Sequence, residues 1–265
     1  MAVVIDPISP VAISVLGIDI RWYALAYIAA FVIGYFLFKR LISKPNSLVK
    51  LNKHQLDDLL TAVVIGVIAG GRLGYVLFYN LGYFLSHPLE IFALWHGGMS
   101  FHGGLIGVIV AIFLFARKRK LNPWALLDLM SVVAPIGLFF GRIANFINRE
   151  VMGRPTDAPW AVVFNGDTQI PRHPSPLYEA ATEGILLFAI MYCLYRFTNL
   201  RQRPGALAGI MGIGYAIFRM ICEQFRAPDA HIGFLTSWGL TMGQMLSGLM
   251  FFAGFAIFMF AIRKK

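Results

Sequence analysis

Seven long apolar stretches constrain the fold of this chain more than any other feature of its sequence. Each is long enough to cross the roughly 30 Å hydrocarbon core of a bilayer, which takes about 20 helical residues. The stretches cover residues 20–38, 56–78, 98–116, 123–141, 177–195, 206–225 and 239–262. Hydrophobic residues make up 58% of the 265 residues, and charged residues only 14%, which excludes an ordinary soluble domain. We therefore predict an all-α integral membrane protein with seven transmembrane helices.

The first stretch is predicted to be a retained helix and not a cleavable signal peptide. Asp6 and Asp19 precede it, where a signal peptide carries basic residues, and it lacks a small-residue cleavage site. Cys193 and Cys222 fall inside predicted helices without a CxxC pattern, so neither a disulfide framework nor a metal knuckle is indicated. We interpret both cysteines as packing residues.

The distribution of basic residues indicates the orientation in the membrane. A net charge of +10 could suggest nucleic-acid binding, but the positions of the charges match a membrane topology instead. Fifteen of the 23 lysines and arginines lie in alternate loops and the C-terminal tail: Lys39, Arg40, Lys44, Lys50, Lys53, Arg117, Lys118, Arg119, Lys120, Arg196, Arg201, Arg203, Arg263, Lys264 and Lys265. The opposite loops, 79–96 and 226–238, hold only Arg226. The positive-inside rule then places the N-terminus outside and the C-terminus in the cytoplasm, and no nucleic-acid partner is expected.

The domain organisation predicted is one transmembrane domain over residues 1–265 with two insertions on the outer side. The connection 142–176 is long, with a strand-like run at 160–164, and such connections are more often functional caps than linkers. We expect it to form a small head. The segment 79–96 is expected to form an arm, with a short interfacial helix at 87–92.

The stretch GRIANFINREVMGRPT, residues 141–156, places polar chemistry at the end of the fourth apolar run. On a continuing helix, Arg142 would share overlapping faces, at spacings of three and four residues, with Asn145, Arg149 and either Asn148 or Glu150. A single arginine there could simply extend its head group into the interface. The group as a whole, with Glu150 and Gly153 beside it, favours a functional site, since polar groups inside a membrane are usually functional.

A second group, GYAIFRMICEQFR at 214–226, lies in the sixth apolar stretch. Tyr215, Arg219 and Glu223 are spaced four apart and so share one helical stripe, with Arg226 close to it. A buried ion pair between Arg219 and Glu223 is the simplest interpretation. The glutamate could equally orient an arginine whose planar donors bind a phosphate through two oxygens.

A third group, HGGMSFHGG at 96–104, opens the third apolar stretch from the outer side. The start of a helix attracts anions through its unpaired N–H groups. His96 and His102 are six apart, a poor spacing for a helical metal site, and no cysteine or aspartate joins them, so we predict no metal. His102 is either a packed interfacial histidine or a general base, since imidazole titrates near neutral pH.

Two further residues are weak signals when each is taken alone. Tyr23 in RWYAL and Arg72 in GGRLGYVLFYN fall near the outer ends of the first two spans, where tyrosine and arginine are favoured regardless of function. Taken together, the groups place cations and amides from several helices at one membrane level. This convergence predicts binding of an anionic lipid head group or a phosphate leaving group.

These residues resemble a known family, the bacterial prolipoprotein diacylglyceryl transferases. The resemblance is carried in order by RWYAL, GGRLGYVLFYN, HGGMSFHGG, GRIANFINREVMG, HPSPLYEA and FRAPDA, and it covers most of the chain. It implies an enzyme of the bacterial inner membrane, with a periplasmic head and arm and an active site facing the outer leaflet. It also implies transfer of the diacylglyceryl group of phosphatidylglycerol to the cysteine thiol of a prolipoprotein signal peptide. A thioether forms, glycerol phosphate is released, and no cofactor takes part.

The resemblance also implies roles for individual residues. Catalytic roles fall on His102, Arg142 and Arg219. Substrate-binding roles fall on Arg142, Asn145, Tyr23, Glu150, Gly153, Tyr215 and Glu223, to which we add Arg72 from the motif that contains it. In the mechanism that follows, His102 accepts the thiol proton, and the two arginines neutralise the departing phosphate.

The sequence departs from the family pattern at two positions. Arg21 stands before the WY of the first span, where the family commonly has histidine, so no role is assigned to Arg21. Pro176 replaces a common glutamine in HPSPLYEA, and proline is tolerated in the first turn of a helix.

Two other classes of function remain open from the sequence. A transporter of anionic lipid or organic anions would use buried arginines without breaking bonds, but it should place charges near the midplane. A receptor or scaffold would use the head at 142–176 to hold partners.

Overall fold

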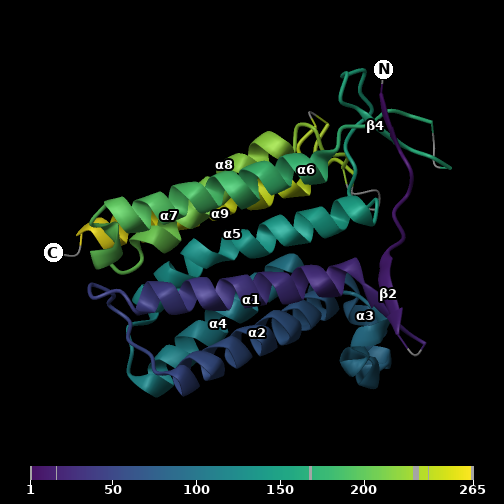
Figure 1. Ribbon diagram of the computed structural model, residues 1–265. Helices are drawn as coiled ribbons and strands as arrows, with labels where there is room; N and C mark the ends of the chain where they lie inside the picture. Colours follow the sequence, from purple (N-terminus) through teal and green to yellow (C-terminus); the bar gives the residue numbers. More distant parts are fainter. Residues whose placement is uncertain (1, 16, 167–168, 229–232, 238, 264–265) are drawn as a thin grey trace. The chain divides into compact units, whose positions relative to one another are not determined.

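The computed structural model describes residues 2–15, 17–166, 169–228, 233–237 and 239–263 (Figure 1). Within these ranges, six helices are long and apolar enough to cross a membrane. They are α1 (Trp22–Ile42), α2 (Lys53–Tyr79), α4 (Phe101–Arg119), α5 (Pro123–Ile147), the continuous helix Ser175–Phe197, and α9 (Met242–Arg263). The chain is therefore a mostly helical, multi-pass membrane protein, as predicted.

The predicted span 206–225 corresponds to a shorter helix, α8 (Ala206–Cys222), which has 17 residues. The expected stretch continued to residue 225, but the helix ends at Cys222, and Glu223 and Arg226, which follow it, make ion pairs. The polar end of the stretch thus belongs to the ion-pair cluster described below.

The continuous helix Ser175–Phe197 has three parts. It begins with α6 (Ser175–Glu179), widens into a π-helical segment, η3 (Ala180–Leu186), and continues as α7 (Leu187–Phe197). Pro176 lies in the first turn of α6, where its missing N–H costs no helical hydrogen bond, as predicted. The described residues also form short 3-10 helices, namely η1 (Pro88–Phe92), η2 (Leu94–His96) and η4 (Leu200–Gln202).

The chain divides into two compact units: Met1–Phe38 with Asp128–Lys265, and Lys39–Leu127. In the smaller unit, α2 and α4 pack along a seam of glycines. A Cβ at Gly70 would lie 2.4 Å from the carbonyl oxygen of Gly103, and one at Gly66 would lie 2.7 Å from that of Gly107. Small residues therefore let the two helices approach at backbone distance, as is common inside membranes.

The segment between α2 and α4 folds as an arm made of α3 (Leu81–Ser86), η1 and η2. The predicted short helix at 87–92 is confirmed by η1. Leu89, Phe92 and Trp95 are each at least three-quarters exposed. An exposed apolar and aromatic surface of this kind is typical of a segment at a membrane interface.

In the larger unit, α8 packs against α7 and α9, which lie beside it in Figure 1. The contact with α9 also depends on glycine, because a Cβ at Gly209 would lie 2.7 Å from the carbonyl oxygen of Gly254. Cys222 is buried in this packing, as predicted. Cys193 is exposed, so its interpretation as a packing residue is wrong: it lies on the outward face of α7.

The strands of the larger unit lie outside the helical bundle. They are β1 (Val3–Ile5), β2 (Val11–Val15), β3 (Ile18–Arg21) and β4 (Val162–Phe164). β1 pairs in parallel with β4, which confirms the strand-like run predicted at 160–164, and β2 pairs antiparallel with β3. The first residues of the chain are thereby tied to the segment 142–176.

Candidate functional site

Arg142 and Arg219, from two different helices, converge on one buried carboxylate. Arg142 Nε, on α5, lies 2.9 Å from Glu179 Oε2, and Arg219 Nη1, on α8, lies 2.8 Å from Glu179 Oε1. Glu179 has no exposed side-chain surface, and the two arginine side chains are 16% and 11% exposed. The predicted convergence of these two arginines is confirmed.

Three further charges complete an arginine–glutamate cluster, a name we use for Arg142, Arg219, Arg226, Glu179, Glu183 and Glu223. Arg142 Nη2 lies 3.1 Å from Glu183 Oε2, and Arg219 Nη2 lies 2.8 Å from Glu223 Oε2. Arg226 Nη1 lies 3.4 Å from Glu179 Oε1. The predicted pair of Arg219 with Glu223 is therefore present as part of a larger network. With every member ionised, the cluster has a net charge of zero, which offsets part of the cost of burying six charges.

The local sequence explains how two glutamates reach one site. Glu179 ends α6 and Glu183 lies four residues later in the π-helical segment, so both carboxylates project from the same side. Gly184, in the same segment, allows close approach to α5, since a Cβ there would lie 2.7 Å from the Cβ of Phe139. Single π-helical turns are uncommon and are concentrated at functional sites.

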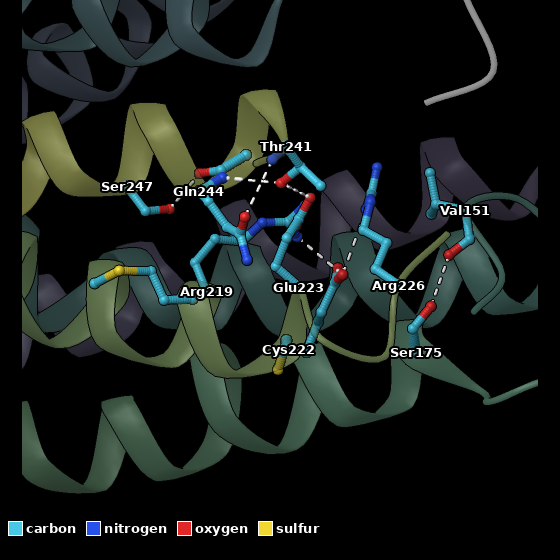
Figure 2. A network of polar contacts seen from close by, with 12 residues as sticks. Val151, Ser175, Arg219, Cys222, Glu223, Arg226, Thr241, Gln244 and Ser247 are labelled. Carbon is cyan, nitrogen blue, oxygen red and sulfur yellow. Dashed lines mark hydrogen bonds and ion pairs between the residues drawn. The ribbon is translucent and has the colours of Figure 1, made fainter. Parts of the chain in front are cut away.

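The start of α9 fixes Glu223 from the other side. Thr241 Oγ1 donates to Glu223 Oε1 at 2.9 Å, and Thr241 also exchanges hydrogen bonds with Gln244 at the beginning of the helix (Figure 2). A Cβ at Gly243 would lie 2.6 Å from the same carboxylate, so only glycine leaves it room. Glu223 is thereby held in one orientation, with its second oxygen on Arg219.

A second polar group unites three predicted residues: Tyr23, Asn145 and Glu150. Tyr23 Oη donates to Glu150 Oε2 at 2.6 Å, and Asn145 Nδ2 donates to Tyr23 Oη and, at 3.2 Å, to Glu150 Oε2. Glu150 is turned back toward α5 because its neighbours Arg149 and Val151 adopt left-handed backbone angles, with φ of 58° and 51°. For a β-branched valine this conformation is strained, and such strain is concentrated at functional sites.

Gly153 occupies a position where two backbones meet. A Cβ there would lie 2.5 Å from the carbonyl oxygen of His173 and 2.6 Å from that of Phe225. The glycine N–H donates to His173 O at 2.9 Å, and a β-bridge joins Gly153 to Arg226. Gly153 therefore positions the segment that delivers Arg226 to the cluster. Its predicted substrate-binding role stays a prediction.

The remaining predicted residues are placed as follows. Tyr215 is buried on α8, four residues before Arg219. His102 lies in the first turn of α4, which Ser100 caps by accepting the N–H of Gly103 at 3.2 Å. His102 belongs to the smaller unit, and its predicted role as a base stays a prediction.

Arg72, also in the smaller unit, is buried and holds the arm. Its guanidinium donates to the backbone carbonyls of Ile91 at 2.9 Å, Glu90 at 2.6 Å, Ala93 at 3.2 Å and Gly98 at 3.2 Å, and also to that of Gly97. Arg72 therefore fixes the arm through its backbone carbonyls. Its position near the end of a predicted span did not indicate this role. Its predicted substrate-binding role stays a prediction.

Glu179 and Glu183 were missed when residues were assigned to the site. The signal was present, because two glutamates four apart interrupt an apolar stretch at 177–195, and ionisable residues inside a membrane usually have a function. Among the residues that the structure describes, no group of three or more histidine, cysteine, aspartate or glutamate side chains could hold a metal ion.

The sequence of the chain is similar to those of known proteins. The family model described as prolipoprotein diacylglyceryl transferase matches residues 10–260. The phosphatidylglycerol-prolipoprotein diacylglyceryl transferase of Methylocella silvestris is 52% identical, over 97% of this chain and 95% of its own length. Proteins of the same name from Rhodospirillum rubrum and Azospirillum brasilense are 51% and 54% identical, over 97% and 93% of this chain and 94% and 92% of their own lengths. The chain therefore belongs to the prolipoprotein diacylglyceryl transferase family.

Proposed function

We propose that this chain transfers the diacylglyceryl group of phosphatidylglycerol to the cysteine thiol of a prolipoprotein signal peptide. The observation that carries the proposal is the convergence of Arg142 and Arg219 on Glu179. The glutamates contact Arg142 along its Nε and Nη2 edge. The Nη1 group of the same guanidinium carries two further donors, which suit a phosphate oxygen.

The proposed chemistry is that of the family, and the placement of the two arginines supports it. The thiolate is the competent nucleophile, so a base first takes the thiol proton. The sulfur then attacks the glyceryl carbon that carries the phosphate. A carbon–sulfur bond forms, the carbon–oxygen bond to phosphate breaks, and glycerol phosphate leaves with that electron pair. Arg142 and Arg219 neutralise the charge that develops on the departing oxygen, an effect that is large in a site of low dielectric.

The proposal includes a topology. We propose seven spans, with the N-terminus and the segment 142–176 in the periplasm, the C-terminus in the cytoplasm, and the active site facing the outer leaflet of the bacterial inner membrane. The 17 residues of α8 extend about 26 Å at 1.5 Å per residue, close to the thickness of the hydrocarbon core. Arg219 lies in the last turn of this helix, and Arg142 lies near the end of α5. Both positions support a site near one membrane surface.

A direct assay tests the function. The purified protein is incubated with phosphatidylglycerol and a peptide that carries the signal cysteine. We expect the peptide mass to rise by one diacylglyceryl group and an equal amount of glycerol phosphate to appear. Transport or binding without any mass change would favour the transporter or receptor alternatives and contradict the proposal.

The role of His102 as the base has its own test. Replacing His102 by glutamine should lower kcat by roughly 10²-fold, the usual contribution of a general base, and should remove the acidic limb from the pH profile of kcat/KM. His96→Gln is the matched control, since His96 pairs with Glu90 at an exposed site on the arm. A His102→Gln enzyme with a normal rate and an unchanged pH profile would exclude this residue from proton transfer.

A further inference from the structure

Asp128 is a buried carboxylate on α5 that binds the beginning of a different helix. The residue as a whole is 3% exposed. Asp128 Oδ2 accepts the N–H of Gly205 at 2.8 Å, and Oδ1 accepts the N–H of Ala208 at 2.7 Å. These N–H groups open α8, whose own N-cap is a glycine with no side chain to offer. Asp128 therefore caps α8 from α5.

The positions of these contacts along the two helices match those of the arginines. Arg142 lies fourteen residues after Asp128 on α5, and Arg219 lies fourteen residues after Gly205 at the start of α8. At 1.5 Å per residue, each interval is about 21 Å. The two helices are joined at Asp128 and run in the same direction. Their arginines therefore lie at the same distance along the helix axes from that contact. Both guanidinium groups meet there on Glu179.

The contact between the Asp128 carboxylate and the start of α8 favours a stable attachment of α8 to α5. A carboxylate at a helix start interacts favourably with the positive end of the helix dipole, and charge-assisted hydrogen bonds are stronger than neutral ones. A cap from within the same chain segment is enough to stabilise a helix, as Asn52 does for α2 and Ser100 for α4. A cap supplied by a neighbouring helix also fixes how far one helix can slide along the other.

We propose that Asp128 is a positioning residue that sets the register of α5 against α8 and so holds Arg142 and Arg219 together at the site. The effect on turnover rests on the proposed function, whereas the effect on the register does not. Loss of the contact lets the two arginines separate along the helix axes. A misplacement of about 1 Å can lower a rate by roughly 10²-fold.

A double-mutant cycle tests the proposal through activity. Asp128→Asn and Asp128→Ser each keep one acceptor for the helix start, so both variants retain part of the cap. We expect each to lower kcat at least tenfold, with KM for phosphatidylglycerol changed less than about threefold. In an Arg142→Lys background, the same changes at Asp128 should lower kcat less than about twofold, because the paired geometry is already lost. Equal losses in both backgrounds would overturn the proposal.

The thermal unfolding midpoint is then measured for the same set of single and double variants. Sites about 21 Å apart normally contribute independently, so a smaller shift from Asp128→Asn in the Arg142→Lys background indicates a shared register. If the shifts in unfolding midpoint caused by the two substitutions are additive, Asp128 does not set the register. That result would not count against transfer by the unaltered enzyme. An inactive unaltered enzyme would refute the proposed function, and the unfolding measurement would still decide on the register.

A matched control lies six residues away. Asn122 caps α5 itself by accepting the N–H of Trp124 at 3.0 Å. Asn122→Ala should lower the unfolding midpoint equally in both backgrounds and leave kcat unchanged. If Asn122→Ala lowers kcat as much as Asp128→Asn does, weakening of α5 explains both effects and the proposal fails.

Discussion

Replacing Arg142 by lysine should lower kcat for transfer from phosphatidylglycerol by roughly 10²- to 10³-fold, the range observed when one preorganised oxyanion contact is lost. Lysine keeps the positive charge but not the planar fork. One ammonium group cannot reproduce the Nε contact to Glu179 and the Nη2 contact to Glu183 while it also binds a phosphate oxygen. We expect Arg142→Ala to fall at least as far, because it also leaves the carboxylates without their cation.

The measurement is initial-rate transfer to a signal-cysteine peptide at saturating lipid. Arg149→Lys is the matched control. Arg149 lies in the same polar stretch with a left-handed backbone, and lysine tolerates that conformation as well as arginine does. The control should retain its rate within about twofold. Near-normal turnover of Arg142→Lys and Arg142→Ala would show that this guanidinium does not act in the reaction.

Replacing Glu179 by glutamine should cause the largest loss of stability of any single change in the cluster. Glu179 contacts all three arginines and has no exposed side-chain surface. Removing one partner from a buried ion pair leaves an uncompensated charge, at a cost of about 3–5 kcal/mol. The glutamine amide would also place its N–H₂ group against the guanidinium groups, where donors face donors and no hydrogen bond can form. We therefore expect a clear fall in the thermal unfolding midpoint together with loss of transfer.

The control for this variant is Glu90→Gln, which removes the half-exposed ion pair with His96 on the arm. Such pairs contribute about 0–1 kcal/mol, so the unfolding midpoint should change little. A Glu179→Gln protein that unfolds within about 1 kcal/mol of the unaltered enzyme would mean that Glu179 is not ionised in the folded state.

The sequence was sufficient for six of the seven predicted spans, because a membrane helix needs a long apolar stretch, and such stretches are visible in the sequence. It was also sufficient for the convergence of Arg142 and Arg219, which the polar stretches in two spans indicated. The carboxylates Glu179, Glu183 and Asp128 are visible as charges within predicted spans, but their partners could not be assigned in the same way. Each lies inside a stretch interpreted as a span, and its partner is contributed by another helix, so only the packing of the helices reveals its role.

Two other outcomes have similar causes. The arm was predicted from its aromatic residues, but the part that Arg72 plays in it depends on backbone carbonyls, which every residue carries and no sequence pattern distinguishes. The end of α8 was placed too late, since hydropathy alone does not show that the helix stops at Cys222, before the charged residues Glu223 and Arg226.

The equal numbers of arginines and glutamates in the cluster have a consequence for turnover. A site that only bound an anion tightly would contain more cationic than anionic side chains. A product with two negative charges would dissociate from such a site slowly. Here the lipid enters with one negative charge and glycerol phosphate departs with nearly two, among three carboxylates that repel it. We therefore expect this charge balance to weaken binding of the product and to favour its release.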